Sequence, residues 1–438
     1  MVSFVQSWFS AASSPIGVDF GSDCLRIAQV EQSDKEYRLV AAASADVPQH
    51  VRNEPAARFA YFGETVRELL TQGSFRGRRV VLNLPASMMY IQHLRLPKMD
   101  DEALKKALVW EARGKLPIDP TQAVLRHIVA GEIYHDQEPK YEIVLMAARR
   151  DWVEQYLAAA AKARLDVVGM NVEPKALLDC FSHIFRRKTD TEITTCFVDI
   201  GCTASRAVIA RSQRIQFARV IPIGGEHFSR AVSAALQIPL EEARLLRIKL
   251  AASQPQEDPR TRRTSPGEAP APAGDPIEGT GFALLNAAVA AAGKRDGTTA
   301  PAPVETVEAA PARMPAAEPQ TAGAVSPVDR ERVEQASREP MARLVEELAL
   351  CRRYYEATFP NQPVERLVFV GGEAHQRALC AGIAREMGIA AQVGDPLARM
   401  VRQSEVGIES GIDRRTQQPA WAIAVGLSVG PAAAEKSK

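Results

Sequence analysis

Two stretches of the chain decide the fold, IGVDFGSDCLRIAQV at residues 16–30 and CFVDIGCTASRAVIA at residues 196–210. Each stretch runs through an apolar strand, an Asp, a Gly that begins a tight turn, and a second apolar strand. A third strand and a helix follow in both places, so the same unit of three strands and a helix occurs twice. We therefore predict an α/β fold that contains a duplication.

The apolar periodicity around the two copies predicts that strands and helices alternate along the chain. Strands are expected at 16–20, 25–31, 37–47, 79–84, 88–96, 123–132, 141–148, 167–172, 195–200, 205–211, 214–221 and 366–370. Helices are expected at 57–70, 101–115, 151–163, 226–236, 340–358, 374–387 and around 421–429. Trp110, in the second of these helices, is expected to be buried in a core.

The two Asp-Gly turns suggest a binding chemistry. In each turn the backbone N–H groups form an anion-binding concavity, and the carboxylate at the strand end can hold Mg2+ through water. One such turn would be ordinary hairpin chemistry, but two in matching frames indicate a phosphate site with its metal ion. We predict Asp19 and Asp199 as the metal-side carboxylates. The other residues predicted at the phosphate are Gly21, Ser22, Asp23, Gly201, Cys202 and Thr203.

Two Gly-Gly pairs extend this prediction. Strand 366–370 runs into Gly371-Gly372 and then a helix, and Gly224-Gly225 precede a helix with Glu226 in its first turn. Glycines at such turns let a flat ligand or a phosphate approach the backbone, although either pair also suits a purely structural turn. No Walker A sequence occurs, which disfavours a P-loop NTPase.

The composition changes abruptly at residues 254–330, where Pro, Ala, Glu, Gly and Thr repeat. We expect a long disordered insertion here, because the segment cannot bury enough apolar surface to offset its chain entropy. The patterns on both sides look helical, which places the insertion within a domain. Residues 1–14 and 431–438 are expected to be tails.

Charge and cysteine usage weigh against several classes of protein. With 54 Lys and Arg against 53 Asp and Glu, the net charge of +1 gives no global attraction to nucleic acid or an anionic bilayer. The 6 cysteines are scattered without a C-x-x-C pair, so neither a zinc site nor a disulfide framework is indicated. No apolar stretch reaches the roughly 18 residues that a membrane span requires.

The order DFGS, DIGCTAS, IGGEHFSRAV and FVGGEAH resembles the phosphate 1, phosphate 2 and adenosine motifs of the actin, Hsp70 and FtsA superfamily. The segment NLPASMMYIQHLRLPKMDDEALKKALVWEARGKLPIDP at residues 83–120 narrows the resemblance to the PilM family, since it is similar to PilM's small inserted subdomain. VVGMNVEPKALL, EEARLLRIK, VGDPL and WAIAVGLSVG also fall where PilM has similar stretches.

This resemblance implies an actin-like (ribonuclease H-like, duplicated) two-lobe α/β fold. The first lobe would span 15–195, with an inserted small α/β subdomain at 86–165, and the second lobe would span 196–430. The resemblance also implies ATP with Mg2+ in the cleft between the lobes. The chain would then be a cytoplasmic adaptor in assembly of a type IV pilus or of a related type II secretion system.

The partner that the resemblance implies is the cytoplasmic N-terminal tail of a PilN-like inner-membrane protein, bound beside the inserted subdomain. Through that protein the chain would reach the pilus alignment complex and pilus motor proteins, so its association with the membrane would be indirect. Nucleic acid is not an expected partner.

Two arginines stand at positions where the family binds nucleotide. Arg26 replaces a Lys that can reach phosphate, and Arg is bulkier and forked. In EEARLLRIK, where relatives hold adenosine through a Glu and a Lys, Arg244 and Arg247 occupy the matching positions. Arg26 and Arg247 therefore join the residues predicted to bind nucleotide.

Two alternatives stay open. One is a nucleotide-independent actin-like scaffold similar to the cytoplasmic domain of GspL, and the other is a sugar or acetate kinase of the same superfamily. No residue is predicted to be catalytic, because no polar side chain outside the turns has a forced position. ATP turnover, if present, would be slow.

Overall fold

The computed structural model describes residues 14–435 apart from 34–35, 53, 136–137, 183–191, 253–326 and 403–407. The tail at residues 1–13 and residues 254–326 of the predicted insertion thus lie outside the described residues. The end of that predicted insertion is helical, since α10 (Pro327–Ala336) begins there. Within the described part of the chain, no helix is long and apolar enough to cross a membrane.

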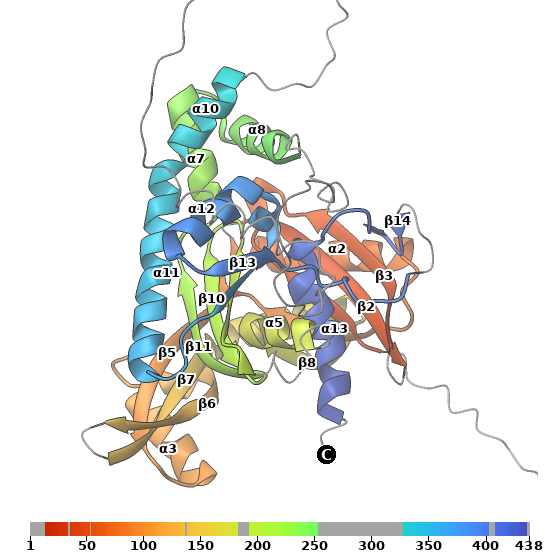
Figure 1. Ribbon diagram of the computed structural model, residues 1–438. Coiled ribbons are helices and arrows are strands. Elements are labelled where there is room, and N and C mark those ends of the chain that lie inside the picture. Colours follow the sequence, from red (N-terminus) through yellow and green to blue (C-terminus); the bar gives the residue numbers. More distant parts are fainter. Residues whose placement is uncertain are drawn as a thin grey trace, which may run out of the picture.

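Two five-stranded sheets with the same topology form the two lobes (Figure 1). The strand orders are β3-β2-β1-β4-β8 and β11-β10-β9-β12-β13, antiparallel among the first three strands and parallel among the last three. This repetition confirms the predicted duplication. The first sheet contains β1 (Ile16–Phe20), β2 (Cys24–Ser33), β3 (Glu36–Asp46), β4 (Arg79–Leu84) and β8 (Asp166–Val172). The second contains β9 (Thr195–Ile200), β10 (Ser205–Arg211), β11 (Arg214–Ile221), β12 (Arg366–Val370) and β13 (Ala390–Val393).

Every residue of β1 is buried because both faces of the first sheet are covered. Ile16 and Val18 belong to an apolar core shared with α2 (Pro55–Gln72) and α4 (Arg150–Lys162). On the other face lies α13 (Ala422–Glu435), which continues past the predicted boundary at residue 430.

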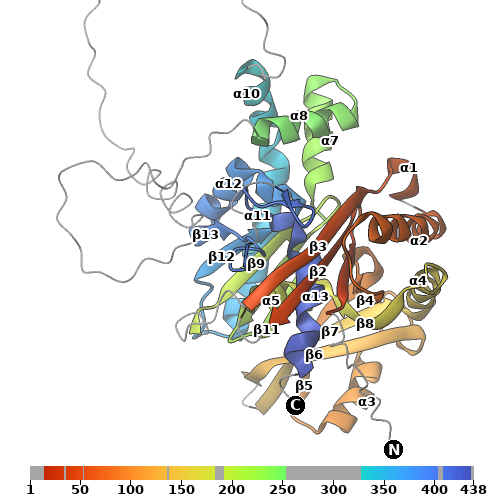
Figure 2. The same ribbon diagram turned by 90° about the vertical axis from the view of Figure 1, so that its right-hand side faces the viewer.

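Glycines let α13 pack closely against its neighbours. A Cβ on Gly17 would lie 1.9 Å from the Ala424 carbonyl oxygen, and one on Gly426 would lie 1.9 Å from the Ala176 carbonyl oxygen. The second contact joins α13 to α5 (Glu173–Ser182), and these two helices lie between the sheets (Figures 1 and 2). Adding a methyl group at such a contact typically costs about 1–3 kcal/mol.

The second lobe carries the remaining long helices. These are α7 (Gly225–Leu236), α8 (Leu240–Ala252), α10, α11 (Arg338–Thr358) and α12 (Arg377–Met387). The helix predicted at 374–387 is divided into a 3-10 turn, Gly372–His375, and α12. The short elements are α1 (Gln49–Arg52), β14 (Ile408–Glu409) and β15 (Ile412–Asp413).

The inserted subdomain is a three-stranded antiparallel sheet of order β5-β7-β6 covered by α3 (Asp101–Glu111). Its strands are β5 (Met89–Pro97), β6 (Ala123–His135) and β7 (Glu138–Arg149). Asp100 caps α3 by accepting a hydrogen bond from the Ala103 N–H at 2.8 Å. Leu104 and Leu108 turn into the core of the subdomain.

Two predictions about this subdomain are wrong. Trp110 is 69% exposed, because the buried face of α3 is the one that carries Leu104 and Leu108. The predicted boundary at residue 165 is also too late. Tyr156 of α4 packs against Phe62 in the core of the first lobe, so the subdomain ends with β7.

The subdomain is attached to the second lobe through a buried carboxylate on β7. Glu142 accepts hydrogen bonds from Arg95 Nε at 3.1 Å and from the Tyr354 hydroxyl of α11 at 2.8 Å. His93 Nδ1 lies 3.1 Å from the same carboxylate, and its Nε2 lies 3.2 Å from the Ala218 carbonyl oxygen of β11. These polar contacts fix the subdomain against β11 and α11.

Candidate functional site

The two Asp-Gly turns have matching backbones. In the first, the Gly21 N–H donates to the Cys24 carbonyl at 3.0 Å, and in the second the Gly201 N–H donates to the Ala204 carbonyl at 3.1 Å. Each turn joins a central strand to its antiparallel neighbour, so both project from the same position of their sheets. The sequence repeat is thus a repeat in three dimensions.

Both turns line one cavity of about 570 Å3. A volume of this size is typical of a site for a small ligand or cofactor. Most of the predicted site residues line it, namely Asp19, Gly21, Ser22, Asp23, Arg26, Asp199, Gly201, Cys202, Gly225, Glu226, Gly371 and Gly372. Residues from α8, including Leu240, Arg244 and Ile248, form another part of the wall.

Three predicted residues are not among those that line the cavity: Thr203, Gly224 and Arg247. Thr203 is exposed at the tip of the second turn. The buried Arg247 lies behind the wall, where it donates to the Gly225 carbonyl at 2.9 Å and the Ser229 hydroxyl at 3.0 Å and forms an ion pair with Glu373. Arg247 therefore connects α8 to α7.

The Gly-Gly pairs differ in what they do. After Gly224, the Gly225 N–H donates to the Gly201 carbonyl at 2.9 Å and the Glu226 N–H donates to the Cys202 carbonyl at 2.8 Å, so the start of α7 holds the second turn. Gly371 has a φ of 89°, and a Cβ there would lie 2.3 Å from Asp199 Oδ1. Only glycine leaves room for that carboxylate.

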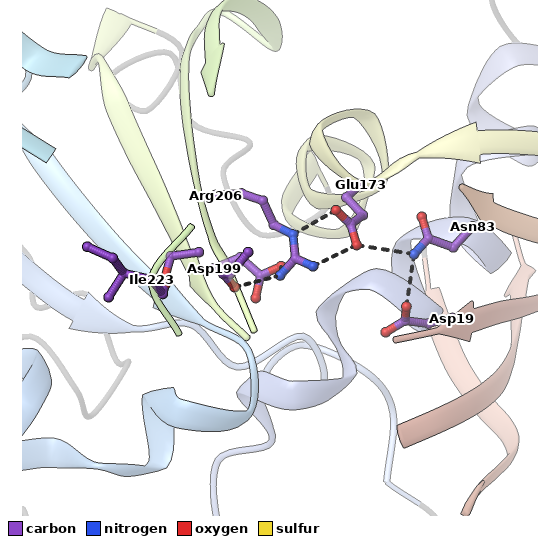
Figure 3. Close-up of polar contacts among 8 residues, drawn as sticks. Asp19, Asn83, Glu173, Asp199, Arg206 and Ile223 are labelled. Carbon is purple, nitrogen blue, oxygen red and sulfur yellow. Dashed lines mark hydrogen bonds and ion pairs between the residues drawn. The ribbon is translucent and has the colours of Figure 1, made fainter. Parts of the chain in front are cut away.

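A chain of polar contacts joins the two turns at the base of the cavity (Figure 3). Asn83 Nδ2, at the end of β4, donates to Asp19 Oδ1 at 3.0 Å and lies 3.4 Å from Glu173 Oε1. Arg206 holds Glu173 with two hydrogen bonds, from Nε at 2.7 Å and from Nη2 at 2.9 Å. Its Nη1 donates to Asp199 Oδ2 at 3.2 Å. The second lobe therefore supplies an arginine to a carboxylate at the start of α5.

Burial controls the charges in this chain of contacts. Burial raises the pKa of the Asp19 carboxyl to about 7, although Arg26 lowers it in part. Burial likewise raises the pKa of Glu173 above its ordinary range. For Arg206, burial alone would lower the pKa, but the Glu173 and Asp199 carboxylates raise it above the ordinary arginine value. Arg206 is thus a permanent cation beneath the cavity.

The residues present fit a directly bound magnesium ion poorly. Magnesium requires several oxygen ligands in octahedral geometry. Here Asp199 and both oxygens of Glu173 already accept hydrogen bonds from Arg206, and Asp19 accepts one from Asn83. Among the residues that the structure describes, no group of three or more His, Cys, Asp or Glu could hold a metal ion. The predicted ion at Asp19 and Asp199 stays a prediction.

An ion pair also crosses the mouth of the cavity. Arg244 Nη2 of α8 lies 3.3 Å from Asp23 Oδ2 of the first turn. Both side chains are partly exposed, at 29% and 23%. This contact is a second, partly exposed connection between the lobes, and the sequence analysis singled out Arg244 only as a departure from the family pattern.

Sequence reasoning missed Asn83, Glu173 and Arg206. The sequence contained a signal for Arg206, because Arg206 follows Asp199 at the same spacing at which Arg26 follows Asp19. In the structure, each arginine pairs with its Asp across the two neighbouring strands. Glu173 lies in the stretch VVGMNVEPKALL, but its contact with Arg206 depends on how the lobes pack. Nothing near Asn83 distinguishes it from other strand residues.

Comparisons with known proteins agree with this architecture. The family model described as "Type IV pilus assembly protein PilM" matches residues 17–257, more than half of the chain. The family model described as "Cell division protein FtsA" matches residues 196–426. No curated protein matches the chain in sequence.

Two solved structures are similar to the chain, and the first of them shows the same fold. One described as "PilM-PilN type IV pilus biogenesis complex" is similar over 95% of this chain and 98% of that chain, at 19% identity and a TM-score of 0.64. The ethanolamine utilization protein EutJ from Carboxydothermus hydrogenoformans is similar over 95% of this chain and 89% of that chain, at 13% identity and a TM-score of 0.44. The first of these structures, the two family models and the duplicated sheets together confirm the predicted actin-like two-lobe α/β fold.

Proposed function

Since the chain belongs to the PilM family of type IV pilus assembly proteins, we propose that it is an adaptor of the pilus assembly machine that binds ATP. The observation that carries ATP binding is the single cavity lined by both Asp-Gly turns. Turn amides and Arg26 would face the phosphates, and the α8 side of the cavity, with Leu240 and Ile248, would face the adenosine.

Nucleotide would act by setting how closely the lobes approach. The lobes meet through Arg206 with Glu173 at the base of the cavity and through Arg244 with Asp23 at its mouth. A ligand that contacts both turns favours the arrangement in which the turns are close. The free energy by which nucleotide changes partner affinity equals the free energy by which the partner changes nucleotide affinity. We assign no catalytic residue, because Glu173, which lines the cavity, already accepts from Arg206 with both of its oxygens.

A matched pair of substitutions tests the cavity. Cys202 lines the cavity, whereas its exposed neighbour Thr203 does not. We expect Cys202→Trp to weaken ATP binding at least about tenfold, and Thr203→Trp to leave it within about twofold, measured by isothermal titration calorimetry. Equal effects of the two substitutions would contradict this placement of the ligand. A chain that binds no ATP would instead be the nucleotide-independent scaffold.

The proposed partner is the cytoplasmic N-terminal tail of a PilN-like inner-membrane protein, bound at the inserted subdomain. Family membership supports this partner, as does the subdomain's surface. Two large apolar side chains are exposed there, Trp110 of α3 at 69% and Tyr134 of β6 at 84%. Exposed aromatic residues are typical anchors of protein interfaces. Through this tail the chain would lie at the inner face of the inner membrane.

A peptide titration tests the partner site. Trp110→Ala and Tyr134→Ala should each weaken binding of a peptide with the sequence of that tail. The larger of the two effects should be about tenfold. Leu245→Ala is the control, because Leu245 is 55% exposed on α8, away from the subdomain. Unchanged binding in both aromatic variants would place the peptide elsewhere on the chain.

A further inference from the structure

Arg206 occupies the place in the cleft where a cation is needed. Its guanidinium contacts Glu173 and Asp199, two carboxylates that are 2% and 6% exposed at their side chains, and the same side chain lines the cavity. Burial of two carboxylates without a cation would be strongly unfavourable. The guanidinium removes that cost while facing the space that we assign to the phosphates.

The second turn is shaped to hold this guanidinium. A Cβ on Gly201 would lie 2.7 Å from Arg206 Nη1, so the absence of a side chain at that position leaves room for the arginine. The Ala204 carbonyl of the same turn lies 3.5 Å from Nη1. Arg206 is 13% exposed at its side chain, and its position is thus determined by the turn and by Glu173 together.

A magnesium ion bound directly to these carboxylates would have to compete with the contacts of Arg206. To reach Asp199 or Glu173 directly, the ion would displace a guanidinium that donates to both residues. Magnesium also loses its own water reluctantly, so a site whose carboxylates are already paired offers it little. A guanidinium cannot be deprotonated in a protein, and its charge is present whether or not metal is available.

We propose that Arg206 supplies the positive charge at the base of the cleft that magnesium would otherwise supply, so that nucleotide binds with little dependence on divalent cations. This inference rests on the proposed binding of nucleotide in the cleft. It deepens that function by naming metal-free nucleotide, ATP or ADP, as a ligand of the site.

The test is ATP titration of the full-length protein by calorimetry, with magnesium in excess and with EDTA. We expect the dissociation constants to differ by less than about threefold. Tight binding with magnesium that weakens by about tenfold or more in EDTA would overturn the inference and leave the proposed function intact. Absence of binding in both conditions would overturn both. This comparison needs no substitution, so it does not depend on whether a variant folds.

Two variants test whether Arg206 is the residue that makes ATP affinity independent of magnesium. Glu173→Gln/Arg206→Gln removes both charges of the ion pair and leaves Asp199 free for metal, so its ATP affinity should become magnesium-dependent by about tenfold. Arg206→Lys is the matched control, because it keeps the charge and should stay insensitive to EDTA. Thermal unfolding checks that both variants are folded. A folded double variant that is as insensitive to EDTA as the wild type would show that Arg206 is not the cation.

Discussion

The first and second Asp-Gly turns have the same backbone but different charges around them. Asp19 faces Arg26 and Asp199 faces Arg206 at equivalent positions of the two strand pairs. Only Arg206 is held by a buried carboxylate from the other side of the cleft, while the Asp19 carboxylate accepts from the neutral amide of Asn83. The duplication thus repeats a backbone frame, and the elements around each turn determine its electrostatics.

The largest expected difference between the turns concerns the two arginines. Arg206→Met would leave Glu173 and Asp199 buried without their cation, which typically costs about 3–5 kcal/mol of folding free energy. Arg26→Met should cost only about 1 kcal/mol, because among the described residues Arg26, unlike Arg206, forms no ion pair with a buried carboxylate from the other lobe. Urea denaturation of the two variants measures both losses of folding free energy. Equal losses would contradict the difference in electrostatics that we assign to the two turns.

A second difference concerns Gly371, whose backbone lies against the Asp199 carboxylate. Gly371→Ala should destabilise the protein by about 2–3 kcal/mol, because its φ of 89° disfavours a side chain and the new Cβ would meet Asp199 Oδ1. Gly372→Ala is the matched control, since a Cβ there has no atom within 4 Å. Similar thermal unfolding temperatures for the two variants would contradict this explanation.

A third difference is the dependence on pH. Burial raises the pKa of Asp19 from 3.8 to about 7, so the folded protein keeps a proton that the unfolded chain has released. Stability should therefore fall by about 1–4 kcal/mol as pH rises from about 4 to about 7, and level off above. Asp19→Asn should abolish this contribution and be more stable than the wild type at pH 8.

Asp199→Asn is the comparison for that experiment. It weakens the contact with Arg206, so it should lower stability at pH 8 by about 1–2 kcal/mol. Denaturation across the pH series measures both variants. If Asp19→Asn also lowered stability at pH 8, the Asp19 carboxyl would not carry the cost of burial that we assign to it.

The smallest expected effect lies at the mouth of the cavity. Asp23 and Arg244 are partly exposed, so a double-mutant cycle with alanine at both positions should give a coupling energy of at most about 1 kcal/mol. A coupling of about 3 kcal/mol would indicate instead that the mouth, and not the base, holds the lobes together.

The fold was largely predictable because its signal is local. The strands around Asp19 and Asp199 are short apolar runs ended by glycine turns, and their repetition in one frame predicted the two matching sheets. The subdomain boundary at residue 165 was missed because the periodicity of α4 shows that it is a helix and does not show which core it joins. Trp110 was misplaced because its type favours burial, whereas the spacing of Leu104 and Leu108 determines the buried face of α3.

The candidate site was predictable only in part. Residues in the turns are placed by their own backbone, so Gly21, Ser22, Gly201 and Cys202 line one cavity, whereas Thr203 at the tip of the second turn does not. Arg247 was misplaced because one face of a helix cannot be assigned to a ligand or to a neighbouring helix from spacing alone. Glu173 reaches Arg206 only because the lobes pack together, and that contact joins distant parts of the sequence.

Hydrogen–deuterium exchange with and without ATP tests most directly whether the two turns share one ligand. We expect ATP to slow exchange in peptides that cover residues 20–26 and residues 200–206, because phosphate oxygens would accept hydrogen bonds from amides of both turns. Exchange in α4, which packs in the core of the first lobe and does not line the cavity, serves as the reference within the same experiment. Protection of only one turn, or of neither at a saturating ATP concentration, would contradict the proposed site between the lobes.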